Sequence, residues 1–417
     1  MHRLLETFLA GTIKKGCLDI VDSSGALRRF GDGSGVPVHV RFNSAAAERA
    51  VLLDPEMKLG EAYMDGGYDI EVGTVLDLLT LLLVNVGGPG RTWWTTALDA
   101  CRSVIRRVGE NNDIGRARNN VQRHYDLDGR LYSLFLDTDR QYSCAYFEDG
   151  VTNLDEAQLA KKQHIAAKLN LGPGQRVLDI GSGWGGLAIY LAEAFKVDVT
   201  GVTLSEEQCA VSNQRAKERG VSDRVRFLLQ DYRTVTGPFD RVVSVGMFEH
   251  VGRSHCSEFF KQLYALLADD GIAVLHTIAK KNDPGPINPW MRRHIFPGAY
   301  LPTLSELAPV IERQGFWLTD LENWRQHYAK TLAAWNDRFQ AHRAEALAIY
   351  DERFCRMWEF YLQLCELGFR ISGLCVFQMQ FAKQIDAVPI TRDYIYNRTE
   401  DTEEAPKPAQ QMLRTST

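Results

Sequence analysis

The chain has 417 residues, of which 45% are hydrophobic and 24% charged, and its formal net charge is -5. This composition is typical of a globular protein with room for two domains. The acidic balance argues against broad electrostatic binding to nucleic acid, so no nucleic-acid partner is expected.

Eight cysteines are scattered along the chain without a C-x-x-C pair or the Cys/His spacing of a zinc site. Reduced thiols in the cytoplasm fit this pattern best, and no metal is expected. The longest apolar run, at 75–86, contains Asp77 and is shorter than the roughly 20 residues that a membrane span needs. The sequence therefore predicts no membrane-spanning helix.

The first part of the chain predicts a small α+β domain over residues 1–115. It combines an amphipathic start, a glycine-rich bend at 31–35, the strand-like run at 36–42 and the apolar helix at 75–84. A basic piece follows at 102–118, with a polar linker expected near 110–115.

From residue 119 the pattern becomes a regular alternation of strands and helices. Strands are expected at 176–180, 197–202, 225–229, 240–245 and 272–277, and helices at 184–195, 205–219 and 256–267. Such alternation predicts an α/β fold with a parallel sheet covered on both faces. The catalytic domain is expected to span 116–398, and the polar segment 399–417 to form a disordered tail.

Helical periodicity returns at 304–313 and across 329–369, where aromatic residues are abundant. The favoured interpretation is a helical subdomain that buries its own core. The alternative is that these aromatic residues form the walls of an apolar channel.

The most informative segment is RVLDIGSGWGG at 176–186, in which an apolar strand leads into four glycines. Glycine lets the backbone turn sharply and lie close to a ligand, and the following helix aims its N-terminal amides at the same place. A dinucleotide site would require an acid at the tip of the second strand, but Asp198 stands at the start of that strand. Asp231 follows the third strand instead, where its carboxylate beside Tyr232 could hydrogen-bond and flank an adenine; a simple strand terminus is the alternative use of such an Asp.

Two further strands end in side chains that carry chemistry. Glu249 and His250 follow the fourth strand, and His276 lies at the end of the fifth. The carboxyl ends of parallel strands meet at the edge where ligands bind in open α/β sheets. For His276 alone, a buried ring satisfied by the backbone is an equally good interpretation.

These residues belong to a set of motifs that closely resembles the cyclopropane-fatty-acid synthase family, over about 120–385 and in the right order. The motifs are QYSCAYF, VLDIGSGWGG, GVTLSEEQ, LLQDYR, SVGMFEHVG, LHTI, IFPGAYLP, HYAKTLAAWNDRF and RMWEFYLQLCELGFR, and LGEAYMDGGYDIE at 59–71 resembles the N-terminal domain of the family. The resemblance implies a class I methyltransferase-like Rossmann sheet with helical insertions. It also implies S-adenosylmethionine-dependent addition of a methylene unit to the cis double bond of phospholipid acyl chains.

The chemistry implied by the resemblance requires a base, because the carbocation left by methyl transfer must lose a methyl proton before the ring closes. The family is understood to hold bicarbonate for this task. Its expected ligands here are Cys144, Glu249, His276, Ile278 and Tyr328, with Cys144 and Ile278 using backbone groups. The bicarbonate hydroxyl would donate to Glu249, while His276 and Tyr328 donate to the other oxygens.

The resemblance also assigns the cofactor contacts. The expected residues are Tyr142, Ser143, Asp179, Gly181, Ser182, Gly183, Trp184, Gly185, Thr203, Leu204, Ser205, Gln208, Asp231 and Tyr232. Ser182 replaces the usual cysteine of the family, a small departure because the loop works through its backbone. Cys365 matches a cysteine proposed as catalytic and stays a candidate, although transfer from a sulfonium to an alkene needs no thiol nucleophile and simple packing is favoured.

The expected partners are phospholipid acyl chains and the inner face of the membrane, at which the N-terminal domain would lie peripherally from the cytoplasmic side. A homodimer is left open. Two alternatives remain for the activity: a product with a methyl branch or a methylene group made by the same family, or methylation of a nitrogen or oxygen in a small molecule.

Overall fold

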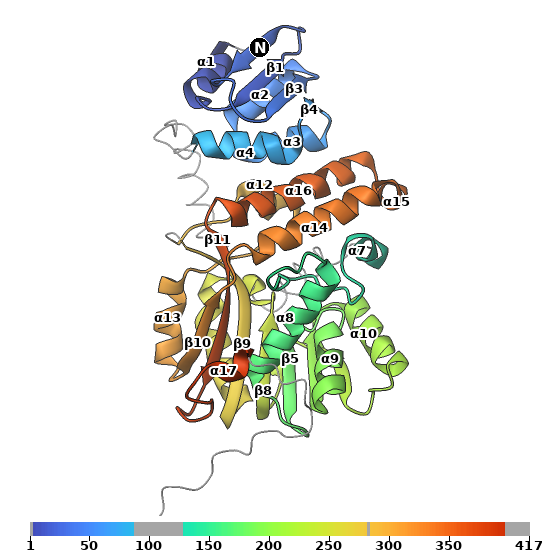
Figure 1. Ribbon diagram of the computed structural model, residues 1–417, viewed down its shortest axis with the longest axis vertical. Helices are drawn as coiled ribbons and strands as arrows, with labels where there is room; N and C mark the ends of the chain where they lie inside the picture. The colour runs from blue at the N-terminus through green and yellow to red at the C-terminus, as the bar shows by residue number, and fades with distance from the viewer. Residues whose placement is uncertain (1–2, 87–127, 282–283, 397–417) are drawn as a thin grey trace, which may run out of the picture.

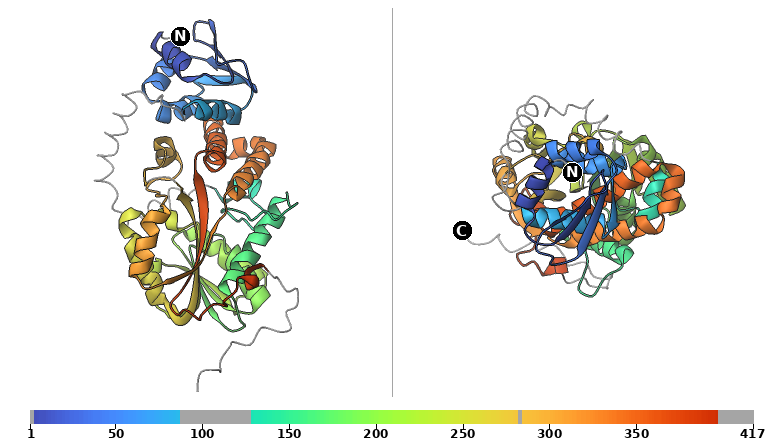
Figure 2. Two further views of the ribbon diagram at one scale, coloured as in Figure 1. Left: turned by 60° about the vertical axis from the view of Figure 1, so that its left-hand side comes forward. Right: turned by 90° about the horizontal axis from the view of Figure 1, so that it is seen from above.

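The computed structural model describes residues 3–86, 128–281 and 284–396, and their elements are stacked along one long axis (Figure 1). A small N-terminal unit lies at one end, a large sheet with helices on both faces lies at the other, and a layer of helices separates them. Figure 2 shows the same order from a second side, with the N-terminal unit above the helical layer. The basic piece at 102–118, the linker at 110–115 and the tail at 399–417 lie outside the described residues.

The N-terminal unit mixes helices with a four-stranded sheet, as the sequence predicts for this region. Its elements are α1 (Arg3–Thr12), β1 (Cys17–Val21), β2 (Leu27–Phe30), β3 (Pro37–Phe42), α2 (Ala45–Leu53), α3 (Pro55–Met64), β4 (Tyr68–Val72) and α4 (Val75–Val86). The strand order is β2-β1-β3-β4, in which β1 and β3 are parallel and the outer pairs antiparallel. Ser44 caps α2 by accepting the N–H of Ala47, and Asp54 caps α3 in the same way.

The large sheet has the order β10-β11-β9-β8-β5-β6-β7. Its strands are β5 (Arg176–Ile180), β6 (Asp198–Thr203), β7 (Val225–Leu229), β8 (Phe239–Val245), β9 (Leu267–Lys280), β10 (Trp317–Asn323) and β11 (Leu374–Ala382). When the strands are renumbered in chain order with β5 as the first, and the sheet is read from β7 to β10, the order is 3-2-1-4-5-7-6. β11 is antiparallel to both of its neighbours. This is the α/β arrangement of the class I methyltransferases.

The expectation of a purely parallel sheet is therefore wrong at one edge, because β10 and β11 were not predicted. β10 mixes polar and apolar residues and β11 is a mostly apolar run, and both lie beside strongly helical sequence, where periodicity alone does not separate a short strand from a helix end. β9 also begins five residues before the expected strand and extends three beyond it.

Helices cover both faces of the sheet. One group comprises α8 (Leu154–Leu169), α9 (Gly186–Phe195), α10 (Glu206–Glu218) and α17 (Asp393–Tyr396), and the other comprises α11 (Cys256–Leu266) and α13 (Leu304–Arg313). Alternate residues of a strand face opposite sides, so Val177 of β5 packs in the core beneath α8 and α9, while Leu178 packs in the core beneath α11 and α13. Both side chains are fully buried.

The middle layer contains α7 (Gly129–Phe135), α12 (Pro289–His294), α14 (His327–Ala341), α15 (Arg343–Ile349) and α16 (Glu352–Arg370). Trp335, Phe339 and Trp358 are buried here, which confirms that this aromatic-rich region builds a core. The core does not stop at the layer, because one hydrophobic cluster continues into the N-terminal unit.

Polar contacts also tie the N-terminal unit to the helical layer. The guanidinium group of Arg356 on α16 donates to Asp69 Oδ1 at 2.6 Å and to the carbonyl oxygens of Tyr63 and Tyr68. On α12, His294 lies 3.0 Å from a carboxylate oxygen of Glu61. These contacts join α3 and β4 to the helices that enclose the site described next.

Candidate active site

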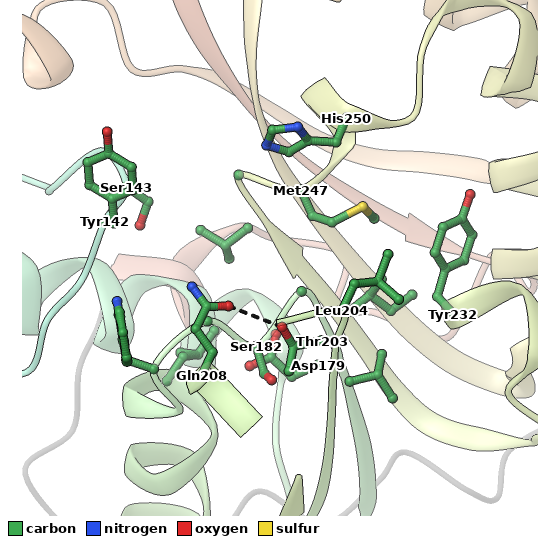
Figure 3. A pocket seen from close by; sticks show the side chains of 18 of the residues that line it. Tyr142, Ser143, Asp179, Ser182, Thr203, Leu204, Gln208, Tyr232, Met247 and His250 are labelled. Atoms are coloured by element: carbon green, nitrogen blue, oxygen red, sulfur yellow. Dashed lines mark hydrogen bonds between the residues drawn. The ribbon is translucent and has the colours of Figure 1, made fainter. Parts of the chain in front are cut away.

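The strand order places a ligand site beside β5. β6 and β7 lie on one side of β5, whereas β8 and β9 lie on the other side. Open α/β sheets bind ligands at the carboxyl ends of the strands where the strand order reverses in this way. A cavity of about 150 Å³ opens there. Figure 3 shows side chains from the ends of β5, β6 and β8 and from the segment before α8 around one pocket.

Twelve of the fourteen expected cofactor residues line this first cavity. They are Tyr142, Ser143, Asp179, Gly181, Ser182, Gly183, Trp184, Thr203, Leu204, Gln208, Asp231 and Tyr232. The other two, Gly185 and Ser205, do not line it. Gly185 precedes α9 with a φ of 80°, and an added Cβ would approach Phe227 to 2.7 Å; Ser205 caps α10 by accepting the N–H of Gln208.

The glycine loop needs glycine for two separate reasons. Gly181 has a φ of 83°, and a Cβ there would lie 2.7 Å from Cβ of Met247. Gly183 has a φ of 54°, and no heavy atom lies within 4 Å of its Cβ position. Glycine therefore lets the backbone at 181 lie close to Met247 and leaves the backbone at 183 open to the cavity.

Several buried polar atoms around this cavity have no hydrogen-bond partner among the described residues. They are Oδ2 of Asp179, Oγ of Ser182 and Nε1 of Trp184. Burial disfavours the charged carboxylate and raises the pKa of Asp179 to about 7. Unpaired buried polar groups are costly, so these atoms indicate a place for a polar ligand.

The far wall of the cavity is formed by the end of β6 and the turn after β7. Thr203 Oγ1 donates to Gln208 Oε1 at 3.1 Å (Figure 3). Asp231 accepts the N–H of Arg233 and also pairs with its guanidinium group at 2.7 Å. Asp198 lies at the exposed start of β6, at the other end of the strand, as the sequence argument expected.

A second cavity, of about 330 Å³, adjoins the first. Tyr142, Ser143, Gly246 and His250 line both and form the shared wall. All six expected catalytic residues line the second cavity, although they come from five separate segments of the chain; they are Cys144, Glu249, His276, Ile278, Tyr328 and Cys365.

Glu249 is the buried acid of this cavity. Its Oε1 accepts the backbone N–H of Ile278 at 2.6 Å, whereas Oε2 is buried without a partner among the described residues. Burial raises the pKa of the carboxyl group to about 7, although the hydrogen bond from Ile278 favours the charged form. Ile278, which is expected to offer a backbone group to a ligand, has its backbone N–H bonded to Glu249.

His276 is held as a neutral ring. Burial lowers its pKa well below the usual value, and the nearby charges of Lys161 and Lys168 act in the same direction. The amide nitrogen of Gln378 on β11 lies 3.3 Å from Nδ1, and Trp324 packs edge-on at 4.7 Å between ring centroids. With Gln378 donating to Nδ1, the ring proton is on Nε2 and is available for donation.

The remaining candidates differ in chemistry. Tyr328 packs against Phe369, with ring centroids 4.7 Å apart. Cys144 is fully buried, and burial raises the pKa of its thiol. Burial also raises the pKa of Cys365 to about 12, so that its thiol stays protonated. A thiolate is the nucleophilic form of cysteine, which argues against nucleophilic catalysis by Cys365 even though it faces the cavity.

Comparison with known proteins agrees with this geometry. A family model described as mycolic acid cyclopropane synthetase matches residues 112–379. The cyclopropane-fatty-acyl-phospholipid synthase of Escherichia coli K12 is 38% identical over 350 residues, which cover 84% of this chain and 89% of the relative.

The chain belongs to the cyclopropane synthetase family. Its members are S-adenosylmethionine-dependent methyltransferases. A probable fatty acid methyltransferase of Pseudomonas putida is 37% identical over 66% of this chain and 73% of the relative. The solved structure of the mycolic acid cyclopropane synthase CmaA1, in complex with SAH and CTAB, superposes with a TM-score of 0.61 at 35% identity, covering 63% of this chain and 97% of that one.

Two residues at this cyclopropane synthetase site were absent from the sequence-based assignment. Gly246 belongs to the shared wall together with His250, which the sequence placed at this edge without a specific role, and the SVGMFEHVG run was the available signal for Gly246. Lys161 on α8 donates to Ser143 Oγ at 2.8 Å. A lysine beside a second lysine in a helix suggests an exposed face, so no sequence signal pointed to it.

Proposed function

We propose that the protein transfers a methylene unit from S-adenosylmethionine to a cis double bond in the acyl chain of a membrane phospholipid and closes a cyclopropane ring, with bicarbonate as the base. The observation that carries the proposal is the wall shared by the two cavities. A cavity at the glycine loop that carries several polar side chains meets a larger cavity with more strongly apolar walls across Tyr142, Ser143, Gly246 and His250. A donor in one and an olefin in the other would meet at this wall.

The first cavity suits S-adenosylmethionine. The unpaired oxygens of Asp179 and Ser182 offer hydrogen-bond partners for polar groups of the ligand, and the open face of Gly183 admits it close to the backbone. Tyr232 and Asp231 stand at the far end, where the sequence argument places the adenosine. When bound, S-adenosylmethionine supplies a methyl group activated by its sulfonium.

The polar side chains of the second cavity, Glu249, His276 and Tyr328, suit a small anion with one proton. The unpaired Oε2 of Glu249 accepts a hydrogen bond, and His276 Nε2 and the hydroxyl of Tyr328 donate. When bound, bicarbonate supplies a basic oxygen. The residues of the chain would orient that oxygen toward the shared wall, where the proton must be removed.

The rest of the second cavity has mostly apolar walls. Apolar side chains line it from α4, α12 and α16 and from the neighbouring loops; they include Leu83, Met291, Phe296, Leu301, Leu364 and Phe369. An alkene is a weak nucleophile and its carbocation is readily trapped by water, so the reaction needs such walls. A small-molecule N- or O-methyltransferase has no such requirement, which is why we place it second.

The substrate must reach this cavity from a lipid surface, and the N-terminal unit offers a route. Leu83 of α4 lines the cavity, while the next residue, Val84, is 57% exposed, and Leu53 at the end of α2 is 68% exposed. None of the described helices has the length and apolar character needed to cross a bilayer. We therefore propose peripheral attachment to the inner face of the membrane through this unit.

Substitution tests the attachment better than deletion, because the N-terminal unit shares its core with α16. We expect Val84→Glu and Leu53→Glu to reduce co-sedimentation with anionic phospholipid vesicles while cofactor affinity stays unchanged. Ile385→Glu is the matched control, since Ile385 is 67% exposed and follows β11 at the end of the sheet opposite the cavities. Equal loss of binding in all three variants would contradict the proposed surface.

The product decides the function. Lipids of a host that expresses the chain should contain a fatty acid heavier by one methylene unit. With a trideuteromethyl donor, a ring retains two deuterium atoms, since one leaves with the base. A methyl branch with all three, or a methylene group in place of the ring, would establish the alternative activity of the same family.

A further inference from the structure

Helix α8 contacts the segment 139–143, which leads into the shared wall. Three side chains on the inner face of α8 reach this segment. Gln158 Nε2 donates to the carbonyl of Ser143 at 3.0 Å, Lys162 Nζ pairs with Asp139 Oδ2 at 2.6 Å, and Lys161 lies between them. This spacing of three and four residues places the three side chains on one face of the helix.

Lys161 is completely buried, which is rare for a lysine. Its Nζ donates to Gln141 Oε1 at 2.6 Å and to Ser143 Oγ at 2.8 Å. Ser143 itself lines both cavities. The charge of Lys161 is therefore one hydrogen bond away from the place where donor and acceptor meet, yet the proposed chemistry assigns it no role.

The protonation state of Lys161 decides how Ser143 behaves. An ammonium group has only donors, so the hydroxyl oxygen of Ser143 must accept from it. The hydroxyl proton is then free to point away from α8. A neutral amine would instead offer a lone pair, and the hydroxyl proton of Ser143 would turn toward the lysine.

We propose that Lys161 is a positioning residue for methyl transfer, whose ammonium group makes the Ser143 hydroxyl an acceptor and so directs the hydroxyl proton toward the junction of the two cavities. Lys161 acts through Ser143 and touches neither ligand. The proposal assigns a purpose to a buried cation whose burial costs desolvation energy.

A double-substitution cycle tests whether the two residues act as one. The variants are Lys161→Met, Ser143→Ala and the double substitution, assayed on unsaturated phospholipid vesicles. Each single variant should lower kcat about tenfold or more, and the double variant should equal Ser143→Ala. Multiplying effects in the double variant, or full activity in Ser143→Ala, would overturn the inference.

Lys162→Met is the matched control. It removes the neighbouring lysine, which holds the same segment through Asp139 but lines neither cavity. If Lys161 only supported the fold, both lysine variants would lower kcat in proportion to their loss in Tm. We expect the control to lose Tm while its kcat stays within about threefold.

The pH dependence of kcat tests the role of Lys161 even if Lys161→Met does not fold. Burial lowers the pKa of Lys161 to about 8; Asp137, Asp139 and Cys144 oppose this shift, and Lys162 adds to it. Lys161 also acts on the buried Asp179 and His276. Since the ammonium form is lost as the pH rises, kcat should fall above pH 8 in the wild type. Ser143→Ala should lack that fall, and its persistence in this variant would contradict the inference.

The vesicle assay rests on the proposed function, so the same cycle is also read in cofactor affinity by calorimetry, which needs no acceptor lipid. If the lipids stayed unmodified, the proposed function would be wrong, but the inference about Lys161 would still be tested by the cofactor affinities. Non-additive cofactor affinities would still support coupling between Lys161 and Ser143, whereas additive ones would end the inference.

Discussion

The carboxylate of Glu249 accepts the backbone N–H of Ile278 at 2.6 Å, which joins the turn after β8 to the end of β9. One carboxylate oxygen is thereby fixed, and the other is buried without a hydrogen-bond partner among the described residues; Glu249 itself lines the second cavity. The hydrogen bond orients Glu249 without neutralising it. This makes Glu249 the residue from which the chemistry of the site is best tested.

Glu249→Gln should lower kcat by about a hundredfold or more, because the amide keeps the bond from Ile278 but loses the negative charge that accepts a proton-bearing ligand. Cofactor affinity measured by calorimetry should stay nearly unchanged, since Glu249 does not line the first cavity. Glu312→Gln, at an exposed position of α13, is the control. Loss of cofactor binding in Glu249→Gln would contradict the assigned role.

The rate should also rise with pH through the ionisation of Glu249. Its pKa is raised to about 7 by burial, and the proposed chemistry needs the carboxylate form. We expect kcat to increase between pH 6 and pH 8 in the wild type and to lack this acidic limb in Glu249→Gln. If kcat rose in the same way between pH 6 and pH 8 in both proteins, the rise would reflect the ionisation of another group, such as Asp179.

Stability should change with pH in the opposite direction. Because the pKa of Glu249 is raised in the folded state, its contribution is fully present below the ordinary value of 4.5 and is lost as the pH rises through about 7. Relative to Glu249→Gln, the wild type should lose about 3 kcal/mol of unfolding free energy across this range. Urea unfolding of both proteins at several pH values measures the difference.

Gly246→Ala should reduce activity more than stability alone explains. Gly246 has a φ of 66°, and an added Cβ would stand in the shared wall, 3.9 Å from Cβ of Ser143. The backbone cost is roughly 1–2 kcal/mol. Gly150→Ala is the control, since Gly150 has a φ of 83° with no atom near its Cβ position. Equal activities in the two variants would show that the wall tolerates a methyl group.

Cys365→Ala should retain activity within about threefold, because a thiol with a pKa of about 12 supplies no thiolate near neutral pH. The wild-type enzyme should also keep its activity after treatment with iodoacetamide at pH 7. A hundredfold loss in Cys365→Ala, with the product unchanged in the remaining turnover, would restore a catalytic role to this residue.

The parts of the site that were predictable are those with a local cause. Gly181 is required by a backbone turn that a Cβ would block, and Asp231 follows the third strand directly. The antiparallel strand β11 was missed because its partner β9 lies about a hundred residues earlier, and no local pattern records that pairing. Gly185 was assigned to the ligand because contact with a cofactor and contact with Phe227 impose the same requirement on the sequence.

The sequence by itself determined the family, the order of strands and helices around the glycine loop, and the residue types that carry the chemistry, because backbone sterics and periodic burial act over short distances along the chain. Only the tertiary structure decided that one core unites the N-terminal unit with α16, that Ile278 occupies one oxygen of Glu249, and that Lys161 is buried beside Ser143. These relations join residues that packing brings together from distant segments. Packing depends on the shape of the whole core, which no local run of residues contains.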